Sequence, residues 1–281
     1  MVLGEQGQVL KAAVLGSPVS HSLSPALHTA AYAALGLAQW TYSRREVTAD
    51  QLAGVVAELG EDWRGLSLTM PLKEAAFEVA ATVTDVAREA GAINTLVRRP
   101  DGGWDGANTD VVGIVRTVEH VDHEGSATLL GSGATSRSAA LALVELGVRD
   151  VVVAARNAAA ARDVVDLLQV HGVTGVHVPL GEWARNPHRL IISTLASAAS
   201  AAAGDALATS GRSVCEGATL LDVIYADWPT PLARAAREAG VDVISGLDML
   251  VHQAAEQVHL FTGLRPSLDV MFAAARDAAV G

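Results

Sequence analysis

The chain has very little cysteine: Cys215 is the only one in 281 residues. A single cysteine excludes an intramolecular disulfide and fits a reducing compartment. Aromatic residues are also scarce, at 4%, whereas half of the chain is apolar. Buried cores must therefore rest on aliphatic side chains.

Basic charge is scarce as well, with 20 Lys and Arg against 31 Asp and Glu, a formal net charge of −11. Nucleic-acid binding needs a basic surface, so nucleic acid is disfavoured as a partner. Residues 1–9 lack a basic segment followed by an apolar one, which argues against a secretory signal. The most apolar stretch, residues 190–209, is mostly Ala and Ser and contains Asp205, which disfavours a membrane span. We expect a cytoplasmic protein without membrane contact.

Short β-rich runs alternate with Ala-rich helical runs in two blocks. This alternation predicts an α/β fold of parallel sheets with helices on both faces. The length exceeds one average domain, so two lobes are expected. We place them at residues 1–110 and 111–245, followed by two helices over 246–281, and the polar segment 120–126 is a candidate boundary loop.

A glycine turn opens the second block, between a strand at 127–130 and a helix at 136–146. Its sequence is Gly131-Ser132-Gly133-Ala134-Thr135-Ser136. A Rossmann-type dinucleotide-binding domain has such a turn here, with one glycine for the tight turn and another for close approach to a pyrophosphate at the helix N-terminus. Ser136 departs from the third glycine of that pattern, and an ordinary loop is the alternative.

The next strand ends at Ala155-Arg156-Asn157, without the acidic residue that would bind a ribose 2′-hydroxyl. A guanidinium suits a 2′-phosphate by charge and by bidentate geometry. Arg156 therefore favours NADP over NAD, with an ordinary solvated arginine as the alternative.

Polar residues follow the strands of the first block. Ser22 and Ser24 are alternate residues that could grip a carboxylate, although Ser24 before a proline is also a plain helix N-cap. Thr69 ends a strand, where ligands collect in α/β sheets. Lys73 falls in a first helical turn, an unfavourable place for a cation, so it is a candidate acid/base or else a surface lysine. Segments 95–97 and 104–107 look like a small hairpin around residues 101–103. Taken separately, the asparagines and Asp110 on either side of this hairpin are ordinary turn and helix-start residues.

Six short motifs, taken in their order along the chain, resemble those of the shikimate dehydrogenase family, and the resemblance covers nearly the whole chain. The motifs are Ser22-Leu23-Ser24-Pro25, Leu68-Thr69-Met70-Pro71-Leu72-Lys73, Gly91-Ala92-Ile93-Asn94-Thr95, Asn108-Thr109-Asp110, Asp222-Val223-Ile224-Tyr225 with Thr230-Pro231-Leu232, and Gly246-Leu247-Asp248-Met249-Leu250-Val251-His252-Gln253-Ala254.

The resemblance implies a substrate-binding domain of residues 1–110, completed by helices 246–281, and an NADP-binding Rossmann domain of residues 111–245. It implies the reversible NADPH-dependent reduction of 3-dehydroshikimate to shikimate in aromatic amino acid (chorismate) biosynthesis, without a metal. Lys73 and Asp110 would form the acid/base pair. The substrate would be bound by Ser22, Ser24, Thr69, Asn94, Asp110, Tyr225 and Gln253. The cofactor would be bound by Asp85, Gly131, Ser132, Gly133, Ala134, Thr135, Arg156, Val223, Gly246 and Met249.

The chain also departs from the family pattern. Ala160 stands where a second cation follows the arginine, and Ser67 replaces an asparagine. Because Arg156 is then the one firm partner for a 2′-phosphate, a quinate/shikimate dehydrogenase with NAD preference is an alternative. A non-catalytic relative that binds shikimate or cofactor is a further alternative, and a homodimer is left open.

Overall fold

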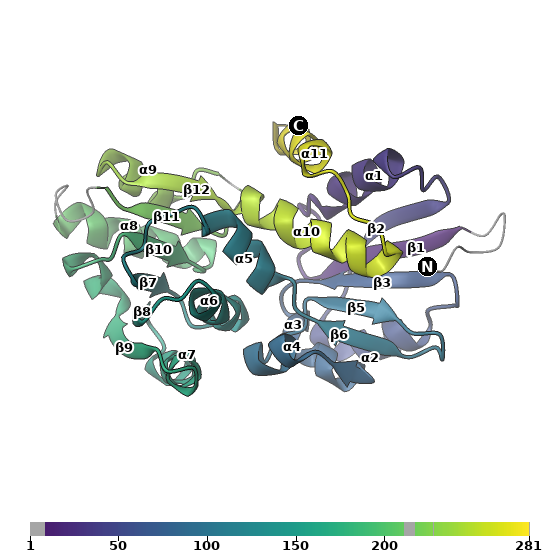
Figure 1. Cartoon of the computed structure of the whole chain (residues 1–281), viewed down its shortest axis with the longest axis horizontal. Coiled ribbons are helices and arrows are strands. Elements are labelled where there is room, and N and C mark those ends of the chain that lie inside the picture. Colours follow the sequence, from purple (N-terminus) through teal and green to yellow (C-terminus); the bar gives the residue numbers. More distant parts are fainter. Residues whose placement is uncertain (1–8, 211–216, 227, 281) are drawn as a thin grey trace. The chain divides into compact units, whose positions relative to one another are not determined.

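The computed structural model describes residues 9–210, 217–226 and 228–280, so Cys215 lies outside the described residues (Figure 1). The chain forms two compact units. The first ends at Gly113 and resumes at Leu250, and the second runs from Ile114 to Met249. The divisions fall inside two helices, α5 (Asp110–Val118) and α10 (Gly246–Thr262). The polar segment 120–126 joins α5 to the next strand within the second unit.

The first unit is built on a mixed sheet, with strand order β2-β1-β3-β5-β6-β4. The strands are β1 (Leu10–Gly16), β2 (Trp40–Glu46), β3 (Trp63–Leu68), β4 (Thr82–Val83), β5 (Thr95–Arg98) and β6 (Trp104–Ala107). β1 pairs in parallel with β2 and β3, whereas β5 is antiparallel to both β3 and β6. The predicted hairpin of segments 95–97 and 104–107 is confirmed by β5 and β6, whose short turn permits only an antiparallel pair, and this makes the sheet mixed where parallel sheets were the general expectation.

Helices cover both faces of this sheet. On one face, α2 (Leu52–Ala57), α3 (Leu72–Ala75) and α4 (Asp85–Ala90) bury an aliphatic cluster against β1, β3 and β5. Two short 3-10 turns, Ala49–Gln51 and Ala76–Glu78, precede α2 and follow α3. The other face carries α1 (Ser24–Ala34) and α10, and α11 (Leu268–Val280) packs against α1.

Helix α10 lies directly on strand β3. A Cβ at Gly65 would meet the Phe261 ring at 2.2 Å, so this position has no room for a side chain. Two residues along the same face of β3, Ser67 donates a hydrogen bond to Gln257, one helical turn before Phe261. The glycine thus lets the helix approach closely enough for polar side chains to reach the strand.

The start of helix α1 differs from the sequence expectation. Leu23 is the N-cap residue, and no side-chain cap bond is present. The alternative in which Ser24 caps this helix does not hold, because Ser24 is already its first helical residue. Instead the Ser24 N–H donates to Ser22 Oγ at 3.3 Å, which couples the two serines.

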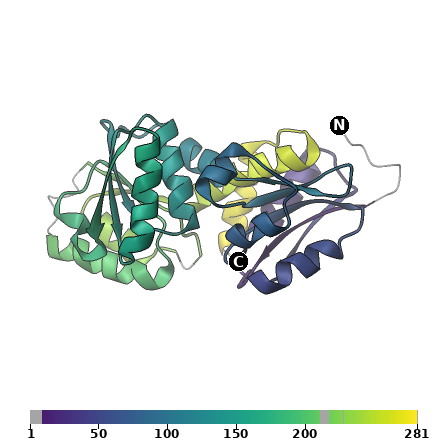
Figure 2. The ribbon, with the colours of Figure 1, turned by 90° about the horizontal axis from the view of Figure 1, so that it is seen from below.

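The second unit contains a fully parallel sheet with strand order β12-β11-β10-β7-β8-β9. Its strands are β7 (Ser126–Leu130), β8 (Asp150–Ala155), β9 (Thr174–Pro179), β10 (Leu190–Ser193), β11 (Thr219–Asp222) and β12 (Asp242–Ser245). Its helices are α6 (Ala134–Glu145), α7 (Ala158–Val170), α8 (Ser197–Ser210) and α9 (Pro231–Glu238), with a 3-10 segment at Leu180–Arg185. Figure 2 shows helices on both sides of the sheet. This is the doubly wound order whose direction reverses between β7 and β10, where such sheets bind ligands.

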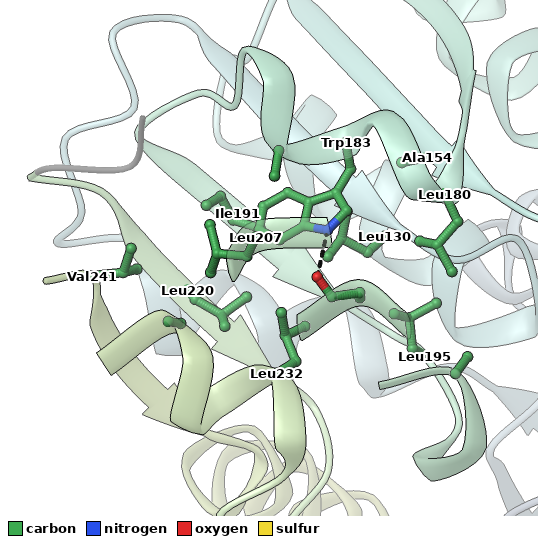
Figure 3. Close-up of a cluster of buried hydrophobic side chains, with 14 of the residues drawn as sticks. Leu130, Ala154, Leu180, Trp183, Ile191, Leu195, Leu207, Leu220, Leu232 and Val241 are labelled. Carbon is green, nitrogen blue, oxygen red and sulfur yellow. Dashed lines mark hydrogen bonds between the residues drawn. The ribbon is translucent and has the colours of Figure 1, made fainter. Parts of the chain in front are cut away.

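The core under α8 and α9 is aliphatic around one tryptophan (Figure 3). Trp183 is 2% exposed, and its Nε1–H donates to the Ala203 carbonyl at 2.9 Å. Leucines from β7, β11 and α9 pack around the ring. The indole is thus buried with its one polar atom satisfied, as burial requires.

Within the described ranges, none of the helices has both the length and the apolar character that crossing a membrane requires.

His28 of α1 gives the first unit a pH-dependent stability. The ring is completely buried and stacks on Tyr42, with the centroids 3.9 Å apart. Burial lowers the pKa of His28 from 6.5 to about 3, so the folded protein keeps this ring neutral.

We predict that the free energy of unfolding falls between about pH 7 and pH 5, because His28 gains a proton in the unfolded chain but not in the folded one. The single group should contribute about 2 kcal/mol over this interval. Urea unfolding of the wild type and of His28→Phe at both pH values measures it. From pH 7 to pH 5, the free energy of unfolding of the wild type should fall by that amount relative to that of His28→Phe. An equal change in both proteins would contradict the assignment.

Candidate functional site

Strands β1 and β3 are parallel neighbours, so the loops that leave their carboxyl ends meet at one edge of the sheet. The Ser17 N–H donates to the Met70 carbonyl at 3.0 Å, and the Thr69 N–H donates to the Leu15 carbonyl at 2.9 Å. These bonds bring Thr69 to the edge from which the segment with Ser22 and Ser24 departs.

Lys73 and Asp110 form the central pair of this region. Lys73 is the second residue of α3, Asp110 is the first residue of α5, and Nζ lies 2.6 Å from Oδ2. The two side chains are only 15% and 6% exposed. The carboxylate lies favourably at its helix N-terminus and offsets the unfavourable place of the lysine in the first turn of α3. The pair thus holds an ammonium group in a largely desolvated position.

Two asparagines complete the surroundings of the carboxylate. Asn94 Nδ2 donates to Asp110 Oδ1 at 2.9 Å, so each carboxylate oxygen has its own partner. Asn94 Oδ1 accepts from the Thr109 N–H at 2.8 Å. Asn108 Oδ1 accepts from the N–H groups of Asp110 and Val111 and so caps α5. The role of Asn108 was not predicted, although an asparagine two residues before an acidic helix start is a usual capping signal.

Helix α10 adds two buried amides to the first unit. Gln253 Oε1 accepts from Thr109 Oγ1 at 3.4 Å. Gln257, one turn further along, is 1% exposed and was not singled out from the sequence. Its spacing of four residues from Gln253, on an otherwise apolar helix face, was the available signal. Asp85 lies elsewhere, as the exposed first residue of α4 in an ion pair with Arg88.

In the second unit, the glycine turn after β7 is held by hydroxyl groups. Gly131 has a φ of +120°, and a Cβ there would lie 2.4 Å from Thr194 Oγ1. Thr194 Oγ1 donates to the Leu130 carbonyl at 3.0 Å and lies 2.6 Å from Ser136 Oγ, which accepts from the Gly133 N–H at 3.0 Å. The serine that departs from the glycine pattern therefore fixes the turn. Thr194 was missed because it follows β10 and is distant in sequence.

The open side of this turn fits a pyrophosphate. A Cβ at Gly133 would meet nothing within 4 Å, so a ligand can approach the backbone there. Ser132, Ala134 and Thr135 are half-buried around it, and the twelve-residue helix α6 begins at this point, with its positive dipole end at the turn.

Arg156 follows the last residue of β8 and is exposed. Across residues 9–210, 217–226 and 228–280 it makes no ion pair, and Asn157 caps α7 by accepting from the Ala159 and Ala160 N–H groups. A guanidinium without a protein carboxylate is available for an anionic ligand group.

Three further cofactor candidates lie in the second unit. A Cβ at Gly246 would lie 2.0 Å from the Val223 carbonyl oxygen, so these two residues are in direct contact. Met249 follows one turn into α10 and is 7% exposed. Tyr225 is half-buried in the loop after β11. The neighbouring Asp222 is buried, which raises the pKa of its carboxyl, and it accepts a hydrogen bond from Thr230 Oγ1 at 2.6 Å.

No group of three or more His, Cys, Asp or Glu side chains in the described part of the chain is arranged to hold a metal ion.

Comparison with known proteins gives a consistent result. Two family models match: the shikimate dehydrogenase substrate binding domain over residues 14–96 and the shikimate 5′-dehydrogenase C-terminal domain over residues 246–276. A shikimate dehydrogenase (NADP(+)) from Synechococcus sp. (strain JA-2-3B'a(2-13)) is 36% identical over 277 residues, which cover 94% of this chain and 93% of the relative.

Two solved structures are similar over nearly their whole length. The Mycobacterium tuberculosis shikimate dehydrogenase is 42% identical with a TM-score of 0.85, covering 95% of this chain and 99% of the other. The Thermus thermophilus shikimate 5-dehydrogenase, in complex with NADP(H) and shikimate, is 33% identical with a TM-score of 0.81, covering 96% and 99%.

The two glycines of the turn provide a matched pair of substitutions. We predict that Gly131→Ala lowers the free energy of unfolding by roughly 1–3 kcal/mol, because alanine is strained at this φ and its Cβ collides with Thr194. Gly133→Ala should cost less than about 1 kcal/mol, since its φ of −89° suits alanine and the space is open. Urea unfolding of both variants measures this, and equal losses would show that Thr194 does not constrain the turn.

Proposed function

The chain belongs to the shikimate dehydrogenase family, and from this membership we propose that it catalyses the reversible NADPH-dependent reduction of 3-dehydroshikimate to shikimate in aromatic amino acid biosynthesis. The observation that carries the proposal is the Lys73–Asp110 pair, with its 2.6 Å separation and its low exposure. A desolvated ammonium fixed by a carboxylate is suited to proton transfer at a carbonyl oxygen.

Bound NADPH would supply the hydride that adds to the ring carbonyl carbon. As negative charge develops on the carbonyl oxygen, the Lys73 ammonium donates a proton to it, a contribution of about 10²–10⁴-fold in rate. Asp110 orients the ammonium through their 2.6 Å contact, and Asn94 holds the other carboxylate oxygen in place. In the reverse direction, Lys73 accepts the proton of the hydroxyl group that is oxidised.

The proposed substrate site is formed by the polar residues around this pair. The Ser22 and Ser24 hydroxyls bind the substrate carboxylate, with Tyr225 beside it. Thr69, Asn94, Asp110 and Gln253 bind the ring hydroxyls. The close approach of the loops after β1 and β3, and the bond between Thr109 and Gln253, support this grouping.

The proposed cofactor site uses the glycine turn for the pyrophosphate, through Gly131, Ser132, Gly133, Ala134 and Thr135. Arg156 binds the 2′-phosphate, and Val223, Gly246 and Met249 lie at the nicotinamide. The open space at Gly133 and the missing carboxylate partner of Arg156 within the described residues support these roles. Asp85 is retained as a cofactor-side residue, although its ion pair with Arg88 does not bear on that role.

We also propose that the first unit binds the substrate and the second the cofactor, with the boundaries near residues 110 and 245. The cytoplasm is the proposed compartment, supported by the single cysteine. Assembly as a homodimer stays a prediction.

One assay grid tests the proposed function. Purified protein is supplied with shikimate or quinate, each with NADP or NAD, and nicotinamide reduction is followed by absorbance. We expect the highest kcat/KM with shikimate and NADP. Preference for quinate with NAD would replace the proposal by the quinate/shikimate alternative, and ligand binding without turnover in any combination would make the chain a non-catalytic relative.

Lys73 should be essential for turnover. We predict that Lys73→Ala folds normally, by circular dichroism, while kcat falls by about 10²–10⁴-fold because the proton donor is lost. Lys11→Ala is the matched control, since Lys11 forms an ion pair with Asp62 on the surface, and its kcat should equal that of the wild type. Undiminished turnover by Lys73→Ala would remove this residue from the mechanism.

Arg156 should determine cofactor preference. Charged hydrogen bonds contribute about 1.5–3 kcal/mol, so Arg156→Ala should raise the KM for NADP by about 10–100-fold and leave the KM for NAD nearly unchanged. Arg185→Ala, which removes an exposed arginine paired with Glu182, is the control. A similar rise in both KM values would show that Arg156 does not recognise the 2′-phosphate.

A further inference from the structure

A chain of buried hydrogen bonds in the first unit leads to Asn94, whose bond to Asp110 is the only one of its bonds that the proposed mechanism uses. It begins at Tyr42 of β2, whose hydroxyl donates to Ser67 Oγ at 2.7 Å. Ser67 Oγ donates in turn to Gln257 Oε1 of α10, also at 2.7 Å. Tyr42, Ser67 and Gln257 are 8%, 4% and 1% exposed, so water does not supply alternative partners.

The Gln257 amide connects this series of hydrogen bonds to strand β5. Its Nε2 donates to Thr95 Oγ1 at 3.0 Å and to the Asn94 carbonyl at 3.3 Å. A carbonyl oxygen can only accept, so the amide has one orientation, with Nε2 toward β5 and Oε1 toward Ser67. Thr95 Oγ1 then donates to Asn94 Oδ1 at 2.7 Å.

All donors in this chain point the same way. The last step is Asn94 Nδ2 donating to Asp110 Oδ1, opposite the oxygen bound by Lys73. Successive hydrogen bonds of one direction polarise each other, and here they end at a carboxylate, the strongest acceptor in the region. Asn94 Oδ1 thus accepts from Thr95 Oγ1 and from the Thr109 N–H, while Gln257 bonds to Thr95 Oγ1 and to the main-chain carbonyl of Asn94.

The pairing of β3 and β5 explains why one amide can reach both strands. Ser67, which stands where the family pattern has an asparagine, lies directly opposite Thr95 in this antiparallel pair. The Gln257 amide bonds to both positions, since Oε1 accepts from Ser67 Oγ and Nε2 donates to Thr95 Oγ1. An asparagine at position 67 would itself present an amide on the face that carries Thr95.

We propose that Gln257 is a positioning residue, which holds Asn94 and through it the Lys73–Asp110 pair in the geometry for proton transfer. This inference rests on the proposed function for its catalytic consequence but not for its geometry. The competing interpretation is that Gln257 only stabilises the packing of α10 on the sheet.

The first experiment measures the geometry without using activity. The chain contains only two lysines, Lys11 and Lys73, so amine labelling reports on the pair directly. Gln257→Leu should raise the rate of Lys73 acylation by an N-hydroxysuccinimide ester several-fold relative to Lys11, as measured by mass spectrometry of the full-length protein. Val258→Ala removes fully buried packing from the next position of the same helix and should leave the ratio unchanged. An unchanged ratio in Gln257→Leu, or an equal rise in Val258→Ala, overturns the proposal.

The second experiment measures the catalytic consequence. Gln257→Leu should lower kcat by about tenfold and raise the KM for shikimate, while the KM for NADP stays unchanged. Adding Ser67→Asn to Gln257→Leu should restore much of the lost kcat by returning an amide to the opposite strand. A role in stability alone would lower the melting temperature without changing kcat or either KM per folded molecule, and that result overturns the proposal.

If Gln257→Leu fails to fold, Ser67→Ala removes one hydroxyl and the bond to Gln257 Oε1, and it should cause a smaller change of the same kind in both measurements. No change in either would overturn the proposal. The wild-type assay separates the two hypotheses, because a wild type without turnover contradicts the proposed function, whereas the labelling ratio still tests the position of Lys73.

Discussion

The first unit depends on keeping one carboxylate charged in a place that water hardly reaches. A desolvated carboxylate is costly unless every lone pair that faces the protein has a donor. Asp110 meets this requirement through Lys73 on one oxygen, Asn94 on the other, and the N-terminus of its own helix. Each donor comes from a different element, so α3, the loop before β5 and the start of α5 must converge on a single point. Removing one donor would leave a buried charge partly unpaired, which explains why the surrounding polar groups are bonded to each other as well.

The second unit has a different arrangement at the edge of its sheet, where the glycine turn follows β7. Here hydroxyl groups fix the turn from its inner side. Ser136 and Thr194 bind the Gly133 N–H and the Leu130 carbonyl, and no side chain fills the space over Gly133. One unit surrounds a carboxylate with donors, and the other leaves space over the backbone where the proposed pyrophosphate would bind. Both arrangements lie at carboxyl ends of parallel strands, where chain direction turns several loops to the same edge.

Local signals explain what the sequence could predict. The sequence predicts strands over residues 40–46, 104–107 and 190–193 and a helix over residues 85–90, and β2, β6, β10 and α4 have these limits. Composition and periodicity over a few neighbouring residues, together with turn residues, provide such signals. The glycine turn and the strand-end arginine could be placed from their neighbours in sequence. The Lys73–Asp110 contact could not, because it joins positions 37 residues apart and was implied only by the family resemblance. The cap alternative for Ser24 does not hold, since Leu23 takes the cap position and Ser24 is the first helical residue. The hairpin of β5 and β6 was predictable from its glycine-containing turn, whereas the antiparallel pairing of β5 with β3 depends on the spatial order of the strands, which local patterns do not show.

The contacts of Gln257 could not be predicted from the sequence, since its bond to Ser67 joins residues 190 positions apart. A glutamine on the buried side of α10 is unfavourable by itself, and it makes sense only when strands β3 and β5 are known to lie beneath it. The requirement that it meets belongs to the site rather than to any one residue: Thr95 and the Asn94 carbonyl are buried and need a donor, whichever element provides it. The donor comes from a helix near the other end of the chain, and the same amide accepts from Ser67 of β3. The hydrogen bonds around Asn94 therefore join β3, β5 and α10, so the surroundings of this residue depend on packing across the first unit and not on its neighbours in sequence alone.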